Sequence, residues 1–254
     1  YYNLRVGTCS ECNDIISGVF GGFARPTGGA FGNMIQRTSI ELSVQPDTYY
    51  WSVQTIDTGL EKSSWDIEQI LVTFNPIGSC DINIDEPGLW KLTQDISSEG
   101  DCIEIKSDDV TLNCDGHTIT GQIINTGAQY DNEINAALND IGSDTKARDD
   151  NITNATGNGV ISEGRENIII ENCDIQSFSN GILFDSTDNS LIQNNKLSNN
   201  NLGIRMKSVS SENVVSSNII KNNFGGIILT DSSDNLIHNN MFENNANALD
   251  FGEN

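Results

Sequence analysis

The sequence is poor in basic residues. Of its 254 residues, 13 are Lys or Arg and 36 are Asp or Glu, which gives a formal net charge of −23 at pH 7. Nucleic acids and anionic membranes are bound by basic surfaces, so this balance argues against both as partners. The acidic excess favours a solvated outer surface. The alternatives are the binding of divalent cations, with Ca²⁺ as the candidate cofactor, and a salty habitat.

Long apolar runs are also missing, so no segment is predicted to span a membrane. No signal peptide opens the chain, which agrees with a mature or excised segment. Aromatic residues make up 7% of the chain, and they are sparse in its repetitive part, which leaves little material for stacking against sugar rings.

The C-terminal third of the chain repeats about every 22 residues. A glycine-like position recurs at spacings of 22, 23 and 22 residues: Gly181, Gly203, Gly226 and Ala248. Apolar residues then occupy alternate positions, as in strands whose side chains point to opposite faces. Stacking of the units predicts two inward columns: Ile182, Ile204, Ile227 and Leu249 in the first, and Phe184, Met206, Leu229 and Phe251 in the second. Short strands with this period predict a solenoid.

Asparagines recur in phase with the repeat. Asn195, Asn218 and Asn240 are predicted to stack as an internal ladder, because buried amides persist only when they are hydrogen-bonded. A second set opens the next segment of each unit: Asn189, Asn213 and Asn235. A leucine-rich repeat has a similar period, but it needs a Leu-rich consensus and usually a helix, and neither is present. We therefore predict an all-β chain in which residues 77–254 form a right-handed parallel β-helix with a loop insertion at about 122–158.

The run from Glu99 to Gly121, EGDCIEIKSDDVTLNCDGHTITG, resembles the entry coil of right-handed β-helix repeat proteins. That group includes NosD-like periplasmic proteins, carbohydrate-active β-helices and many surface proteins of archaea and bacteria. The resemblance covers roughly residues 78–254 and implies the fold. It does not imply one activity, because a single scaffold hosts many functions.

Residues 1–76 are predicted to form a separate antiparallel sandwich. Glycine and asparagine clusters separate four strand-like segments: Tyr2–Gly7, Ser39–Val44, Thr48–Asp57 and Ile67–Phe74. The run from Val44 to Tyr49 favours a tyrosine corner, the strand-entry feature of immunoglobulin-like sandwiches. This part resembles the latter two-thirds of a fibronectin type III-like module.

A module of that type should begin with two further strands before Tyr1, and a new coil starts at Asn247 without a polar cap. We therefore expect the chain to be a segment of a longer polypeptide. The alternative is that a neighbouring copy donates the missing strands. The expected partners are the rest of a longer chain or other copies of this chain, with a surface polysaccharide as a further candidate.

The spacing of the six cysteines predicts three disulfides. Cys80 and Cys102 lie 22 residues apart, or one coil, and Cys114 and Cys173 both fall near the asparagine-ladder position of successive coils. Cys9 and Cys12 then close a small loop. A metal site is a weaker interpretation, because the Cys9–Cys12 pair lacks a second pair nearby, and a redox pair would need a helix N-terminus. Disulfides predict an extracellular, cell-surface location.

The polar insertion carries two N-glycosylation sequons, at Asn151 and Asn154, on the most loop-like segment of the chain. Residues Ala136–Leu138 are predicted to form a short helix in the same insertion.

Enzymes with a β-helix place their chemistry on one outward face. The corresponding column here contains Leu183, Arg205, Ile228 and Asp250. Arg205 and Lys207 with Asp185 could form a lyase-like corner, but an ion pair between adjacent coils is the favoured interpretation. His117 and His238 lie in unrelated turns and are interpreted as structural. We predict no catalytic residue and no metal site.

The function predicted from these features is structural or adhesive: a segment or subunit of a surface filament, sheath or large adhesin. The alternative is a carbohydrate-active β-helix, either a uronate lyase or hydrolase or a polysaccharide-binding module. A calcium-stabilised surface module is compatible with the first prediction.

Overall fold

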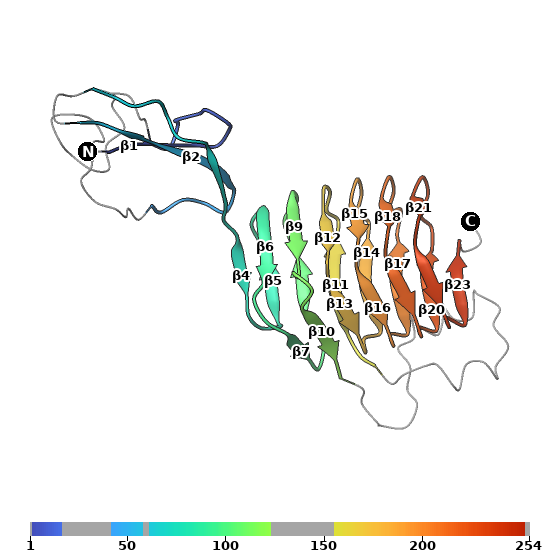
Figure 1. Ribbon diagram of the computed structural model, residues 1–254. Helices are drawn as coiled ribbons and strands as arrows, with labels where there is room; N and C mark the ends of the chain where they lie inside the picture. The colour runs from blue at the N-terminus through green and yellow to red at the C-terminus, as the bar shows by residue number, and fades with distance from the viewer. Residues whose placement is uncertain (1, 17–41, 58–60, 123–154, 252–254) are drawn as a thin grey trace. The chain divides into compact units, whose positions relative to one another are not determined.

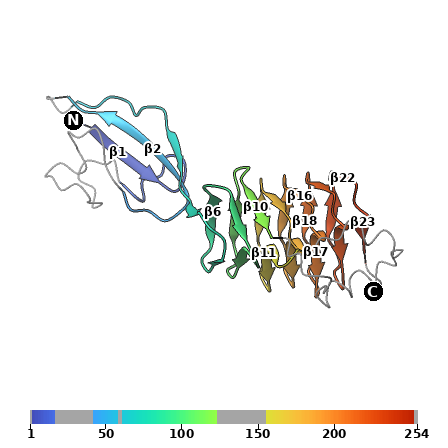
Figure 2. The same cartoon turned by 90° about the horizontal axis from the view of Figure 1, so that it is seen from below.

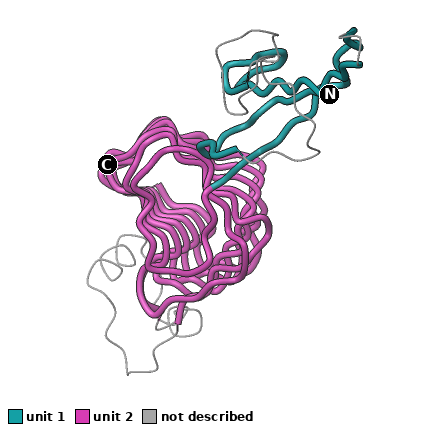
Figure 3. The backbone as a smooth tube through the Cα atoms, turned by 90° about the vertical axis from the view of Figure 1, so that its left-hand side faces the viewer, with its two compact units in different colours: residues 1–74 teal, residues 75–254 magenta. Residues whose placement is uncertain are grey.

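A computed structural model describes residues 2–16, 42–57, 61–122 and 155–251. The chain divides into two compact units, Tyr1–Phe74 and Asn75–Asn254 (Figure 3). This boundary lies two residues before the predicted one. The reason is that β4, Asn75–Ile77, pairs in parallel with β6, Gly88–Leu92, and so belongs to the second unit.

The first unit contains a three-stranded antiparallel sheet in the order β1-β2-β3. Its strands are β1 (Tyr2–Gly7), β2 (Thr48–Thr55) and β3 (Gln69–Val72). A small core holds Leu4, Val6, Ile16 and Tyr49. The Tyr49 hydroxyl donates a hydrogen bond to the backbone oxygen of Gln45 at 2.8 Å, which is the geometry of a tyrosine corner.

Two predicted strands of this unit differ in the structure. β3 is shorter than the predicted Ile67–Phe74, and residues 42–44 are not in a strand, while residues 39–41 lie outside the described part of the chain. Among the described residues of this first unit only one sheet is present, so the fibronectin type III-like sandwich stays a prediction.

The second unit is a parallel β-helix, in which three parallel sheets run along one axis (Figures 1 and 2). One sheet consists of β4, β6, β9 (Val110–Asn113), β12 (Ile169–Glu171), β15 (Leu191–Gln193), β18 (Val214–Ser216) and β21 (Leu236–His238). The second consists of β5 (Ile82–Ile84), β8 (Ile103–Ile105), β11 (Asn158–Glu163), β14 (Asn180–Asp185), β17 (Leu202–Lys207), β20 (Gly225–Leu229) and β23 (Asn247–Asp250). The third consists of β7 (Ile96–Ser98), β10 (Thr118–Gly121), β13 (Asp174–Gln176), β16 (Lys196–Ser198), β19 (Ile219–Lys221) and β22 (Met241–Glu243).

No helix among the described residues is long and apolar enough to cross a membrane.

Like residues stack directly over one another along the axis, as predicted. Strand pairing places Ile182 beside Ile204, Ile204 beside Ile227, and Ile227 beside Leu249. The three isoleucines are fully buried and Leu249 packs partly buried against the same core. The first inward column is therefore confirmed.

The second inward column is confirmed for three of its four residues. Phe184 pairs with Met206 and Met206 with Leu229, and all three are buried. The assignment of Phe251 is wrong, because β23 ends at Asp250 and the Phe251 side chain is 63% exposed.

The recurrent glycine marks a close approach of neighbouring coils. A Cβ on Gly203 would lie 2.6 Å from the backbone oxygen of Gly226, and a Cβ on Gly181 would lie equally close to that of Gly203. Backbone atoms cannot move aside as a flexible side chain can, so the stacking distance requires glycine here.

The single spacing of 23 residues comes from one extra residue in the turn between β17 and β18. Thr187 and Ser210 are partners in successive coils, through a hydrogen bond from the Thr187 backbone N–H to Ser210 Oγ. Val209 precedes Ser210, is 70% exposed and has a φ of 71°, a conformation that β-branched residues rarely adopt. The turn thus absorbs the extra residue without disturbing the strands on either side.

Candidate functional site

The predicted asparagine ladder lies inside a corner of the β-helix. Asn195 Nδ2 donates to Asn218 Oδ1 at 3.1 Å, and Asn218 Nδ2 donates to Asn240 Oδ1 at 3.0 Å. The backbone N–H of Asn195 donates to the same Asn218 oxygen at 2.9 Å. Asn195 and Asn218 are buried, so these bonds satisfy polar groups that would otherwise be costly to remove from water.

Two further ladders occupy other corners. Neither was predicted as a ladder, although Asn213 and Asn235 were recognised as recurring positions. One contains Asn200, Asn223 and Asn245, and the other contains Ser190, Asn213 and Asn235. The assignment of Asn189 to this last set is wrong: Asn189 is exposed with a φ of 49°, and Ser190 donates its backbone N–H to Asn213 Oδ1. The extra residue at Val209 makes the spacing from Ser190 to Asn213 23 rather than 22, whereas Asn189 lies 24 residues before Asn213.

A sequence signal exists for two of the three ladders, those of Asn195 and Asn200. Asparagine doublets precede most corners, as in Asn194-Asn195, Asn199-Asn200 and Asn222-Asn223. In each doublet the first residue has a φ between 54° and 57° and the second is buried in a ladder. Asparagine tolerates the left-handed region better than most residues, which explains the first member, while amide pairing explains the second.

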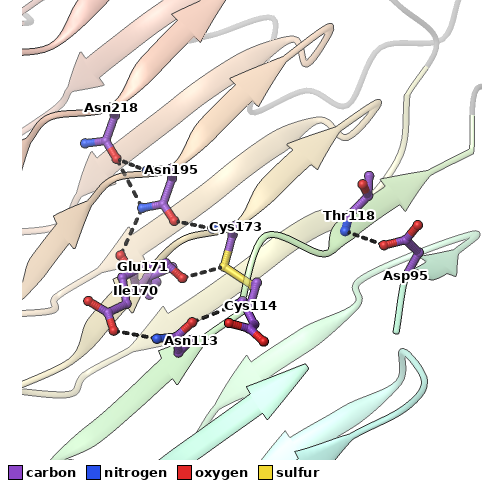
Figure 4. Close-up of a disulfide and its surroundings, with 10 residues drawn as sticks. Asp95, Asn113, Cys114, Thr118, Ile170, Glu171, Cys173, Asn195 and Asn218 are labelled. Carbon is purple, nitrogen blue, oxygen red and sulfur yellow. Dashed lines mark hydrogen bonds between the residues drawn. A yellow bond between two sulfur atoms is a disulfide. The ribbon is translucent and has the colours of Figure 1, made fainter. Parts of the chain in front are cut away.

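The disulfide between Cys114 and Cys173 replaces the first members of the predicted ladder (Figure 4). The Cα atoms are 4.7 Å apart, as in stacked coils, although the residues are 59 positions apart in sequence. The backbone N–H of Cys173 donates to Asn195 Oδ1 at 3.0 Å, so the covalent bond continues into the hydrogen-bonded ladder.

The other two predicted pairs are also present. Cys80 is bonded to Cys102 across one coil, with a Cα separation of 4.4 Å, and Cys9 is bonded to Cys12 in the first unit. All six cysteines of the sequence are therefore paired.

A groove of about 500 Å³ lies on the outside of the Cys114–Cys173 corner. Its walls come from four successive coils and include Asp115, Asn172, Asp174, Asn194 and Lys196. Lys196 Nζ is 2.5 Å from Asp174 Oδ2, so one carboxylate of the groove is neutralised by a cation from the next coil. This groove was not predictable from the sequence, because the insertion separates its walls along the chain.

Carboxylates at and near the groove are held in the ionised form. A hydrogen bond from Lys91, whose Nζ is 2.9 Å away, lowers the pKa of Asp115. The Thr118 backbone N–H, at 2.9 Å, and the His117 ring lower the pKa of Asp95. Ionised carboxylates accept hydrogen bonds or bind cations, and a raised pKa of the kind that a general acid needs is not found in either group.

The outward column proposed for catalysis is paired as predicted but is largely hidden from solvent. Leu183, Arg205 and Ile228 are neighbours in successive strands, with exposed fractions of 6%, 7% and 2%. Asp185 and Lys207 form an ion pair of 3.1 Å between adjacent coils. This geometry agrees with the structural interpretation of that corner.

The remaining predicted sites lie either outside the described residues or in separate turns and strands. Asn151, Asn154 and Ala136–Leu138 lie outside the described residues. His238 is exposed on β21, and the His117 ring lies 3.2 Å from Asp95. Within the described ranges, no group of three or more His, Cys, Asp or Glu side chains is arranged to hold a metal ion.

Comparison with known proteins supports the fold. Residues 135–253 match the family model of the right handed beta helix region. The match covers less than half of the chain and agrees with the parallel β-helix of the second unit. No curated protein matches the chain.

A solved structure, a family 28 exopolygalacturonase from Yersinia enterocolitica, is similar with 11% sequence identity and a TM-score of 0.32. The match covers 78% of this chain and 59% of that enzyme.

Proposed function

We propose that this protein is an extracellular structural or adhesive protein of a cell surface, a segment or subunit of a filament, sheath or large adhesin. The observation that carries the proposal is the pairing of all six cysteines. Disulfides persist in oxidising compartments, which supports a location outside the cytoplasm. Two of the three bonds join successive coils, so they resist separation of the coils when the β-helix is under tension.

The composition and the ladders agree with this role. A net charge of −23 keeps the outer surface solvated, while the three ladders satisfy buried polar groups along the axis. Repeat proteins of this type are stabilised mainly by contacts between neighbouring repeats, so an extended rod needs no large central core.

The proposal is tested on protein isolated from its native source without reductant. Electron microscopy should show fibres or sheets, and peptide mapping without reduction should recover Cys80 linked to Cys102 and Cys114 linked to Cys173. Monodisperse single particles would argue against assembly. Free thiols at Cys80 and Cys102 would contradict the extracellular location.

The groove favours a second candidate, a polysaccharide-binding module. Amides, carboxylates and one ammonium line an elongated surface, and such groups can hydrogen-bond sugar hydroxyls. Calorimetric titration should then detect binding of a neutral polysaccharide. The binding should be weaker in Lys196→Ala and unchanged in Lys221→Ala, a control substitution on another strand. Titrations without heat for neutral and acidic polysaccharides alike would remove this candidate.

A calcium-stabilised surface module remains compatible with the main proposal, since the chain carries 36 acidic residues. Thermal unfolding with and without a chelator tests it, and an unchanged transition would remove it.

A further inference from the structure

The disulfide between Cys9 and Cys12 differs from the other two in its surroundings. Cys9 is exposed and Cys12 is half-buried. In the β-helix, Cys80 is also half-buried, while the exposed fractions of Cys102, Cys114 and Cys173 are 1%, 0% and 2%. Thiol–disulfide exchange needs an external thiolate to reach a sulfur, and Cys9 is the one exposed cysteine of the six, so its bond is the most accessible of the three.

The length of the closed loop separates them further. Cys9 and Cys12 are 3 residues apart, against 22 and 59 for the other pairs. A disulfide that closes a short loop removes less entropy from the unfolded chain, so less folding stability opposes its reduction. Both properties point to the Cys9–Cys12 bond as the first to open.

Contacts that do not involve sulfur hold the same loop in place. The Ser10 hydroxyl donates to Glu68 Oε2 at 2.7 Å and the Glu11 backbone N–H donates to Glu68 Oε1 at 2.9 Å. The Cys12 N–H donates to the Cys9 backbone oxygen at 3.0 Å. At the base of the loop, Thr8 donates to Asp14 through its backbone and its hydroxyl.

None of these contacts involves a sulfur atom, so none depends directly on the sulfur–sulfur bond. The loop therefore keeps Cys12 within reach of Cys9, from which it can displace an external thiol.

We propose that Cys9–Cys12 is an exchangeable disulfide through which the chain forms a covalent bond with an external thiol. The incoming thiolate attacks Cys9 Sγ, the more accessible sulfur. A new sulfur–sulfur bond forms there while the Cys9–Cys12 bond breaks, and its electron pair leaves on Cys12 Sγ, which takes a proton from water. The reverse attack by the Cys12 thiolate releases the partner, and neither direction has a net oxidant or reductant.

The test uses the full 254-residue chain, folded and oxidised. Increasing ratios of reduced to oxidised glutathione are followed by alkylation of free thiols and peptide mass mapping, with circular dichroism on the same samples. Cys9 and Cys12 should become alkylated at a ratio at least about tenfold lower than the other four cysteines, with the fold unchanged. Opening of all three bonds together, or of Cys9–Cys12 last, would overturn the proposal.

Two matched variants isolate the exchange step. Cys12→Ser leaves Cys9 unable to re-form its internal bond, so it should trap one partner as a mixed disulfide. Cys80→Ser leaves Cys102, which is 1% exposed, and should trap none while folded. Equal trapping in the two variants would contradict the inference.

The mass of the trapped species identifies the source of the thiol. An increase by the mass of one glutathione indicates a small thiol, and a doubled mass indicates a second copy of the chain. The wild-type mapping decides the question even if a variant fails to fold.

Discussion

Cys173 and Asn195 occupy the same corner of successive coils, and the backbone N–H of Cys173 donates to Asn195 Oδ1 at 3.0 Å. A covalent bond on one side of Cys173 and an amide ladder on the other therefore form one continuous line along the axis. Four predictions test how the stability of the β-helix depends on this arrangement and on the turns and acidic side chains around it.

The side-chain amide of Asn218 should contribute far more to the free energy of unfolding than that of an exposed asparagine. Asn218→Ala leaves two donors of Asn195 without their acceptor and removes the bond to the Ile192 backbone oxygen. We expect the free energy of unfolding to fall by about 2–4 kcal/mol, measured by urea unfolding. Asn83→Ala, at an exposed strand position, is the control and should change it by less than about 0.5 kcal/mol. Equal losses would mean that the ladder contributes little.

The two disulfides of the β-helix should contribute unequally. Replacing Cys114 and Cys173 by Ala should cost about 4 kcal/mol, and replacing Cys80 and Cys102 about 3 kcal/mol, because the first pair closes the longer loop. Urea unfolding of the two double variants measures both values. The reverse order would show that strain or residual structure, rather than loop length, sets the contribution.

Val209 should be an unfavourable residue for its turn. Its φ of 71° suits glycine, so Val209→Gly should raise the free energy of unfolding by about 1 kcal/mol. Val214→Gly, in strand β18, is the matched control and should lower it. Thermal melts of the two variants show whether each substitution raises or lowers the stability. If Val209→Gly also destabilises the protein, the Val209 side chain contributes to stability despite its exposure.

Acidification should weaken the corner that holds Asp95. The Thr118 N–H and the His117 ring lower the pKa of Asp95 in the folded state, so this carboxylate adds stability above its unfolded pKa. That stability is lost as the pH falls through the depressed folded value. Asp95→Asn should therefore show a smaller drop in melting temperature between about pH 6 and pH 2 than the wild type. Asp85→Asn, an exposed control, should follow the wild-type curve.

The β-helix was largely predictable because its signal is long-range and repeated. Ile182, Ile204 and Ile227 recur in phase, and stacked coils make a spacing of about 22 residues equivalent to contact. The same spacing predicted that Cys80 lies beside Cys102, where the disulfide is found. Where one residue is added, as at Val209, the local phase shifts and a neighbouring assignment such as Asn189 fails.

The groove and its charges were not predictable by the same means. Asp115 and Asp174 come together only because the coils on either side of the insertion are adjacent in space. The depressed pKa of Asp115 depends on Lys91 from the preceding coil, and no periodic pattern marks that pair. Side-chain pairs that occur only once in this way can be recognised only in the three-dimensional structure.

The one-way direction of the amide ladders has a consequence for how such a molecule changes in evolution. The oxygen of each ladder residue accepts from the coil before it, as Asn218 accepts from Asn195 and Asn240 from Asn218, so every coil offers its successor the same set of bonds. Duplicating or deleting one entire unit preserves this pattern, while a partial change within a strand breaks it. The length of the β-helix can therefore change in steps of one coil without loss of the ladder bonds.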